Sequence, residues 1–187
     1  MVAEKKFEVC KDGSRCELRS PTLDDAEAMM DLLRNFSETT DYMLVYPEEC
    51  VDSAETERKI LGAILENPKQ VFIGCFIGSQ MVGNIGVYPV GVRQKLAHRC
   101  QIGIGVRDTH RGNGVGTLLL QYAIEWAKRI GYEQMELDVV SENHAGIRLY
   151  ERFGFRKVGQ IPHGIKRRQG GYYALDFMVL DLQKNIK

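Results

Sequence analysis

A glycine-rich turn at the start of a long amphipathic helix is the feature that most limits the fold of this chain. Residues 110–116 read HRGNGVG and follow an apolar, strand-like run at 96–106. A helix is expected from Gly114 to Ile130, ended by Gly131. Its apolar side chains recur on one face, at Val115, Leu118, Leu119, Tyr122, Ala123, Trp126 and Ile130. This strand–turn–helix order, followed by a further strand at 135–140, predicts an α/β domain.

The bare backbone of this turn suits a phosphate group. The first turn of a helix has backbone N–H groups without partners in the helix, and it carries the positive end of the helix dipole. An anion can approach these groups closely only where no Cβ blocks the way, and Gly112, Gly114 and Gly116 remove that obstacle. Arg111 adds a positive charge and Thr117 a hydroxyl group. The loop is therefore a candidate cradle for a diphosphate.

The turn has three other interpretations. A flexible turn without a ligand is one of them. A nicotinamide-dependent enzyme is suggested by the glycines and by Asp138 about twenty residues further on, but Thr117 stands at the third glycine of GxGxxG. The polar run 107–111 also separates the strand from the glycines, whereas a dinucleotide turn follows its strand directly. The GK[ST] ending of a Walker A loop is absent.

Further elements are expected from periodicity and capping patterns. Thr22 with Asp25, and Asp52 with Glu55, read as helix starts, and Asn67-Pro68 as a helix end. In chain order we expect an arm or edge strand at 1–15, a strand at 16–21, helices from 22 and from 52 to 66, a hairpin of 71–78 with 81–90, a helix at 145–153, and strands at 155–161 and 172–182.

Composition excludes several classes of function. Lys plus Arg and Asp plus Glu balance at 25 each, which gives no sign of a nucleic-acid partner or an anionic membrane. The five cysteines are scattered and have no CxxC pair, so we expect free thiols and no metal site. No apolar run reaches the length of a membrane span or of a secretory leader. These observations predict a cytoplasmic protein.

Two motifs resemble one family. Arg111, Gly114 and Gly116 match R/Q-x-x-G-x-G/A, and residues 143–155, NHAGIRLYERFGF, match N-x-x-A-x-x-L-Y-x-x-x-G-F, with Gly146 in place of the alanine. Both motifs are typical of the GNAT superfamily of acetyl-CoA-dependent N-acetyltransferases. The resemblance extends over about residues 16–182 and is strongest from 96 onward. The last two expected strands and the loop between them resemble those of the branch of this family that acetylates small amines or protein N-termini.

The resemblance implies a fold and a cosubstrate. The fold would be a single α/β domain over 16–182, with an arm at 1–15 and a tail at 183–187. Its mixed, largely antiparallel sheet would contain one central, splayed parallel strand pair and be flanked by helices. Acetyl-CoA would bind without a metal, its pantetheine arm beside the strand 102–106, where Gly103 and Gly105 leave room. The expected binding residues are Ile104, Gly105, Val106, Arg111, Gly112, Asn113, Gly114, Val115, Gly116, Thr117 and Asn143.

The resemblance implies a general acid but does not identify a general base. Tyr150 would be the general acid that protonates the departing thiolate, and Asn143 would contact pantetheine or cap the helix at 145–153. Many relatives carry a glutamate as base where this chain has Gln101, which cannot accept a proton but could still act in catalysis by orienting a water molecule or the amine. The identity of the base is left open. Either the amine arrives from solvent in its neutral form and needs no dedicated base, or another residue replaces the glutamate. The candidate substitutes are Glu38, Glu136, Asp138, His98, His110 and His144.

The acceptor is predicted only as a class. A primary amine of a small molecule or a peptide N-terminus would be attacked in a ternary complex, and carboxylates near the pocket would favour a cationic amine such as a polyamine or an amino sugar. The expected substrate-binding residues are Glu38, Thr40, Tyr42, Glu136 and Tyr172, and the basic run 166–171 is a further candidate. A non-catalytic acyl-CoA-binding or sensing domain is the alternative, suggested by Gln101. Pairing of two chains through the last strands is left open.

Overall fold

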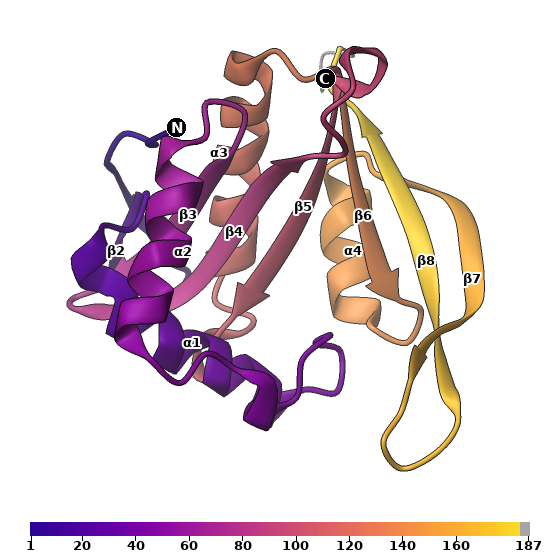
Figure 1. Cartoon of the computed structure of the whole chain (residues 1–187), viewed down its shortest axis with the longest axis horizontal. Helices are drawn as coiled ribbons and strands as arrows, with labels where there is room; N and C mark the ends of the chain where they lie inside the picture. Colours follow the sequence, from indigo (N-terminus) through magenta and orange to yellow (C-terminus); the bar gives the residue numbers. More distant parts are fainter. Residues whose placement is uncertain (184–187) are drawn as a thin grey trace. The chain divides into compact units, whose positions relative to one another are not determined.

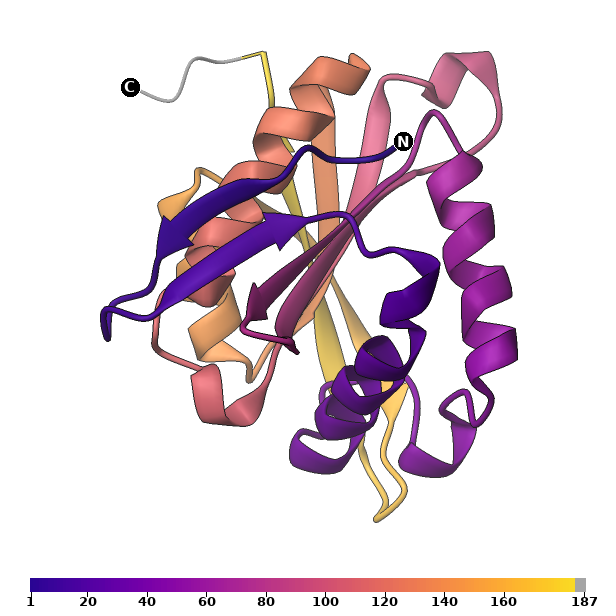
Figure 2. The same cartoon turned by 90° about the vertical axis from the view of Figure 1, so that its left-hand side faces the viewer.

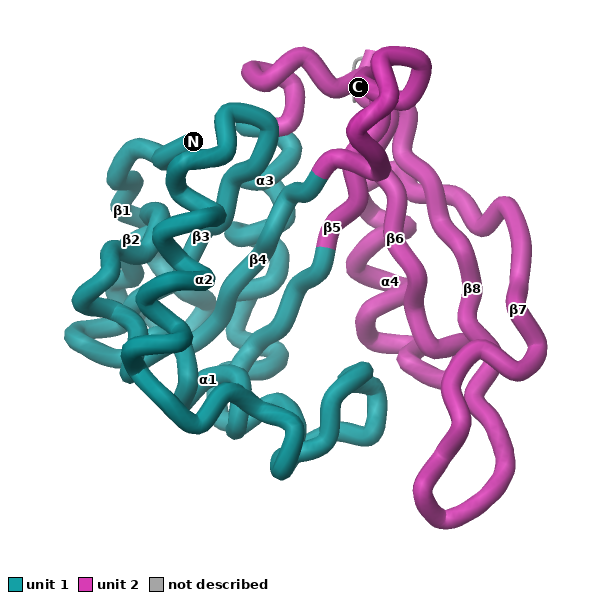
Figure 3. The backbone as a smooth tube through the Cα atoms, in the orientation of Figure 1, with its two compact units in different colours: residues 1–88, 103–126 teal, residues 89–102, 127–187 magenta. Residues whose placement is uncertain are grey.

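The computed structural model describes residues 1–183, in two compact units (Figure 3). The first unit comprises residues 1–88 and 103–126, and the second comprises 89–102 and the chain from 127 onward. The domain boundaries expected from the sequence stay a prediction. Of the tail expected at 183–187, only Gln183 lies within the described residues.

The first unit is built around antiparallel strands. β1 (Lys6–Val9), β2 (Arg15–Arg19), β3 (Val71–Ile77) and β4 (Gln80–Pro89) follow one another as hydrogen-bonded neighbours, and the second half of β5 (Arg99–Val106) belongs to the same unit. The helices α1 (Ala26–Thr39) and α2 (Ala54–Glu66) cover one face of β3 and β4, and the start of α3 (Val115–Ile130) covers the other (Figures 1 and 2).

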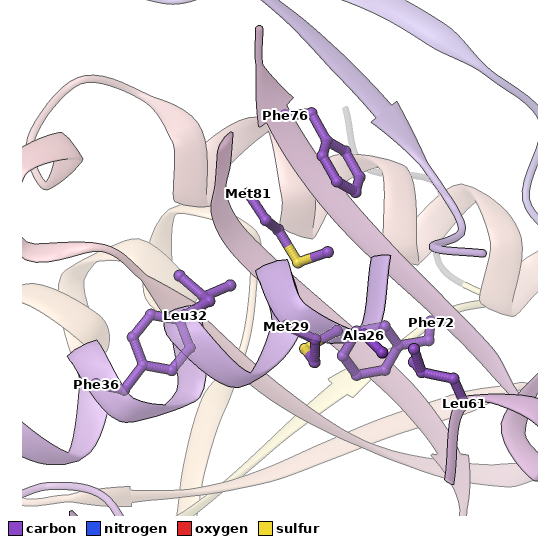
Figure 4. Packing of buried hydrophobic residues seen from close by; sticks show 8 residues of the cluster. All are labelled: Ala26, Met29, Leu32, Phe36, Leu61, Phe72, Phe76 and Met81. Atoms are coloured by element: carbon purple, nitrogen blue, oxygen red, sulfur yellow. The ribbon is translucent and has the colours of Figure 1, made fainter. Parts of the chain in front are cut away.

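A hydrophobic cluster fixes α1 and α2 to this sheet (Figure 4). Helix α1 contributes four buried side chains at helical spacing, and they pack with one from α2 and three from the strands. Burying a large apolar side chain contributes about 1.5–3 kcal/mol, so the cluster accounts for much of the stability of this unit. Its members are Ala26, Met29, Leu32, Phe36, Leu61, Phe72, Phe76 and Met81.

The two capping patterns had different outcomes. The pair of Thr22 and Asp25 is confirmed, because the backbone N–H of Thr22 donates to Asp25 Oδ2 at 2.7 Å. The expected cap at Asp52 is wrong. The residue directly before the helix is Ser53, whose Oγ accepts from the backbone N–H of Thr56 at 3.4 Å. An N-cap side chain reaches the first free N–H groups only from that adjacent position, and Asp52 lies one residue too early.

The second unit contains the rest of β5 with β6 (Gln134–Val140), β8 (Tyr172–Asp181), β7 (Arg156–Lys166) and α4 (His144–Arg152). Residues 99–101 of β5 pair in parallel with 134–136 of β6, and the other pairs are antiparallel. Strand β7 is longer than the expected 155–161. Its register with β8 is interrupted between Ile161 and Ile165, where Pro162 cannot donate to the ladder.

The strand order is β1-β2-β3-β4-β5-β6-β8-β7. Within the described residues this is a mixed sheet of eight strands with one parallel pair, accompanied by four α-helices. The predicted fold class is thereby confirmed. Strand β5 stands between β4 and β6 in this order, and its residues 99–101 make the parallel pairing with β6.

Candidate functional site

The glycine turn of the first unit is held in a defined conformation. Gly112 and Gly114 have φ angles of +79° and +90°, a region that L side chains rarely adopt. The turn is fixed through Asn113, whose backbone oxygen accepts from the N–H of Lys11 at 3.0 Å and whose Oδ1 accepts from the N–H of Asp12 at 2.9 Å. The glycines therefore serve a specific backbone shape, and the interpretation as a flexible turn loses its basis.

Four backbone N–H groups of this turn have no acceptor among the described residues. They belong to Gly112, Gly114, Val115 and Gly116, at the N-terminus of the 16-residue helix α3. A Cβ built on Gly112 would meet nothing within 4 Å, so the space in front of that residue is open. Clustered, unpaired N–H groups at a helix N-terminus are suited to binding an anion, and a diphosphate fits them chemically.

Arg111 connects the turn to α1. Its Nε donates to the backbone oxygen of Val106 at 3.2 Å, and its guanidinium donates to Thr39 Oγ1 at 2.9 Å. A second bond to α1 comes from the buried Arg107, which forms an ion pair with Asp31. These contacts hold the end of β5 and the glycine turn against one helix.

The two glycines of β5 have different neighbours. A Cβ on Gly103 would meet nothing within 4 Å, which agrees with room for a ligand beside the strand. A Cβ on Gly105 would lie 2.2 Å from the Phe36 ring. The expected reason for Gly105, approach of a ligand, is therefore not needed, since close packing of α1 already requires it. Contact of Ile104, Gly105 and Val106 with acetyl-CoA stays a prediction.

In the second unit, α4 places Tyr150 in an apolar environment. Its side chain is 8% exposed and its ring lies 5.8 Å from that of Phe155. Burial raises the pKa of Tyr150 to about 12, so the phenol keeps its proton at neutral pH.

Asn143 is the N-cap of α4, as one of the two expected roles requires. Its Oδ1 accepts from the backbone N–H of Gly146 at 3.0 Å. A Cβ on Gly146 would lie 2.9 Å from Asn143 Nδ2. The glycine that departs from the family motif therefore leaves room for this cap.

The position where a base was expected holds an amide–carboxylate pair. Gln101 Nε2 donates to Asp138 Oδ2 at 3.4 Å, and burial together with the charge of Glu136 raises the pKa of Asp138. For Glu136 itself, burial favours the neutral acid, but hydrogen bonds from Arg99 and Gln134 outweigh it and hold its pKa below the ordinary value. Of these two carboxyls, Asp138 is the better proton acceptor.

The other candidate bases and substrate residues lie at various exposed positions. Glu38, His98 and His144 are exposed, and His110 shares a 2.9 Å hydrogen bond with Thr109. Thr40 is the C-cap of α1, and Tyr172 stacks on His163 with ring centroids 4.4 Å apart. Of the predicted substrate residues, only Tyr42 lines a cavity described below.

Two buried carboxyl groups of the described residues, Glu57 and Asp176, were not among the predicted site residues. Glu57 is only 3% exposed, and it lines a cavity of about 450 Å³ in the first unit. The signal was present, because Glu57 shares one face of α2 with Leu61 and Ile64 at positions i+4 and i+7. A charged residue within an apolar helix face is a candidate functional residue.

Metal-binding groups and membrane-spanning helices are both absent from the described residues 1–183. They contain no group of three or more His, Cys, Asp or Glu side chains that could hold a metal ion. No helix within these residues is long and apolar enough to cross a membrane. The five cysteines are free thiols, and Cys75 and Cys100 are buried, as their apolar surroundings in the sequence predict.

Comparison with known proteins agrees with the geometry. The model of the acetyltransferase (GNAT) family matches residues 27–155. An L-methionine sulfoximine/L-methionine sulfone acetyltransferase of Pseudomonas aeruginosa is 42% identical over 77 residues, which cover 41% of this chain and 44% of that protein. The chain spans between 26% and 53% of the length of the first curated relatives that it matches.

Two solved structures share the fold. An acetyltransferase of the GNAT family from Streptococcus pneumoniae superimposes with a TM-score of 0.84 at 23% identity, covering 89% of this chain and 99% of that one. The yncA protein of Salmonella typhimurium, solved with its cofactor acetyl-CoA, superimposes with a TM-score of 0.80 at 19% identity, covering 99% and 98%. Since the family model matches more than half of the residues, the chain belongs to the acetyltransferase (GNAT) family.

Proposed function

We propose that this protein is an acetyl-CoA-dependent N-acetyltransferase that acts on a primary amine of a small molecule. The observation that carries the proposal is the turn at 112–116, with its four unpaired N–H groups and the open space at Gly112. Family membership supports it, as do two curated relatives that are named for the acetylation of small molecules, L-methionine sulfoximine or sulfone and phosphinothricin. The neighbouring fold from Salmonella typhimurium binds acetyl-CoA and supports the cosubstrate.

In this proposal the first unit holds the cosubstrate. The N–H groups of Gly112, Gly114, Val115 and Gly116 bind the diphosphate, and the dipole of α3 favours its negative charge. Backbone groups of Ile104 and Val106 bind the pantetheine arm, and the open side of Gly103 admits it. A backbone N–H of β5 stabilises the oxyanion that develops on the thioester carbonyl.

The reaction transfers one acetyl group by direct attack. The amine nitrogen forms a bond to the thioester carbonyl carbon, the carbon–sulfur bond breaks, and the sulfur leaves as a thiolate. Tyr150 then donates its phenolic proton to that sulfur. The high pKa of Tyr150 ensures that the proton is present at neutral pH, and general acid catalysis of this kind contributes about 10²- to 10⁴-fold in rate.

Asp138 is a candidate acceptor for the proton that the amine loses. Its raised pKa brings the carboxylate closer to the operating pH, which favours a general base. Gln101 then orients this carboxylate through its amide N–H, a role that needs no proton transfer. A peptide acceptor, a homodimer and a cytoplasmic location stay predictions.

Turnover with a panel of primary amines tests the proposal. The acetylated amine is detected by mass spectrometry, and acetyl-CoA binding is measured by calorimetry. Binding with formation of an acetylated product is expected. Binding without turnover on any amine would favour the non-catalytic acyl-CoA-binding alternative, and the absence of binding would refute both.

A further inference from the structure

The first unit contains one cavity whose wall is almost entirely apolar. It has a volume of about 450 Å³, within the range of small-molecule sites. Its lining comes from α1, α2, the segment between them, β3, β4 and the glycine-rich half of β5. Phe36, Leu61 and Phe72 form its buried wall, while Leu44 and Ile60 are 78% and 41% exposed. Exposed apolar side chains beside such a cavity are typical of a ligand-binding site.

A single carboxyl group lies in this wall. Glu57 is 3% exposed, and no hydrogen bond or ion pair joins its carboxylate to another residue of the described chain. Burial is the only cause that acts on its pKa, which it raises. An ionised carboxylate in apolar surroundings is unfavourable unless a partner reaches it, and the partner available in this wall is a molecule in the cavity.

The other lining residues limit the charge of that molecule. Among the described residues that line the cavity there is no Lys, Arg or His. A carboxylate on the ligand would therefore find no cation, and it would be repelled by Glu57. A second ammonium group would be buried against apolar side chains without a partner. Both charges are costly to bury unpaired.

We propose that this cavity, under the acetyl transfer proposed above, binds a primary amine that carries one apolar group and no carboxylate, and that Glu57 pairs with its ammonium group in the bound complex. The ammonium ion then releases one proton to solvent, so that the nitrogen attacks as the neutral amine. This acceptor differs from the polyamine or amino sugar expected from the sequence. It also differs from the amino-acid substrates for which the Pseudomonas aeruginosa relative is named. The apolar group of the acceptor occupies the space between Phe36, Leu61 and Phe72.

Matched amine pairs test the acceptor class with the wild-type protein. 3-Methylbutylamine and L-leucine differ only by a carboxylate, and hexylamine and 1,5-diaminopentane differ by a second ammonium in place of a methyl group. We expect kcat/KM for the apolar member of each pair to be at least about tenfold higher, because the added charge is buried unpaired. Equal or faster turnover of leucine or of the diamine would overturn the inference.

The variant Glu57→Gln tests the ion pair, because it removes the charge and keeps the volume. It should raise KM for 3-methylbutylamine at least about tenfold, the effect of losing a charge-assisted hydrogen bond, and leave KM for acetyl-CoA unchanged. The matched control is Glu55→Gln on the same helix, where the carboxylate is exposed and pairs with Lys59 at 2.7 Å. An unchanged KM for the amine in Glu57→Gln would refute the pairing.

A second measurement uses the wild-type protein, so it does not depend on whether a variant folds. N,N-dimethyl-3-methylbutylamine keeps the cation without the acylatable N–H, and 3-methylbutan-1-ol keeps the apolar group without the charge. As competitive inhibitors of the wild-type protein, the cation should bind at least about tenfold more tightly than the alcohol. Equal inhibition would contradict the role of Glu57. Turnover of polar amines alone would refute this inference and leave the proposed function standing, whereas no turnover and no acetyl-CoA binding would refute the function itself.

Discussion

Replacing Gly105 by alanine is expected to destabilise the protein, while the same change at Gly103, two residues earlier in β5, is not. The added carbon at 105 would lie 2.2, 2.5 and 2.8 Å from three atoms of the Phe36 ring. At 103 it would meet nothing within 4 Å. The two variants therefore separate the packing requirement of this strand from its proposed contact with acetyl-CoA.

The size of the effect follows from these distances. An ordinary carbon–carbon contact is about 3.5–4.0 Å, so the closest approach to Phe36 is short by more than about 1 Å. Phe36 is buried in the cluster with Met29 and Leu32, so its ring cannot move without disturbing them. Overpacking of this kind costs about 1–3 kcal/mol, and the loss of glycine entropy from the unfolded chain returns about 0.4–1 kcal/mol. A net loss of about 1–2 kcal/mol lowers the melting temperature by roughly 2–8 °C.

Thermal unfolding followed by circular dichroism measures the difference. Gly103→Ala should melt at or slightly above the wild-type temperature, and its acetyl-CoA affinity should fall because the new methyl group occupies the open side of β5. In a Phe36→Leu background, where ring atoms are removed, Gly105→Ala should cost at least about 0.5 kcal/mol less than in the wild type. The packing argument is refuted if Gly105→Ala is as stable as Gly103→Ala. It is also refuted if the effects of Gly105→Ala and Phe36→Leu on stability are additive.

Three further outcomes are expected. Tyr150→Phe should lower kcat at least about 100-fold with unchanged acetyl-CoA affinity by calorimetry, and an unchanged rate would remove Tyr150 from its role. Gly114→Ala should cost roughly 1–2 kcal/mol, because an L side chain is forced to a φ of +90°, and should also weaken acetyl-CoA binding; unchanged melting and affinity would contradict this. The folded pKa of Glu136 lies below its ordinary 4.5, so its ion pair stabilises the fold above that pH and is lost as pH falls through the folded pKa. Glu136→Gln should therefore melt below wild type at pH 7, with the difference vanishing in acid.

Local signals in the sequence predicted most of the elements. The apolar periods of 2 and 3.6 placed the helices and strands, and Gly131 and Gly154, with φ of +94° and +90°, mark the helix ends where they were expected. The main error in length, at β7, comes from pairing with β8 across Pro162. Such pairing depends on residues far apart in the chain, and periodicity within a segment carries no information about it.

In the candidate site, too, the features set by local sequence were predictable and those set by contacts between distant residues were not. The glycine turn was predictable because its conformation depends on the local backbone. The bond between Gln101 and Asp138 was not, because it depends on how β5 and β6 align, and the two partners are 37 positions apart in the sequence. Glu57 could be seen on the apolar face of α2, but its burial depends on which elements cover that face.

Three acidic residues illustrate how surroundings determine what a carboxyl group can do. Glu136 is stabilised as an anion by Arg99, and Asp138 has only an amide donor beside the charge of Glu136. Glu57 has neither, and since its folded pKa is raised, the stability linked to its neutral form is lost as pH rises through that pKa. At neutral pH the buried charge of Glu57 therefore weakens the fold, and in the proposal above a bound ammonium ion removes this cost. A carboxyl group that destabilises the free protein and is satisfied by the ligand is what selective binding of a cationic amine requires.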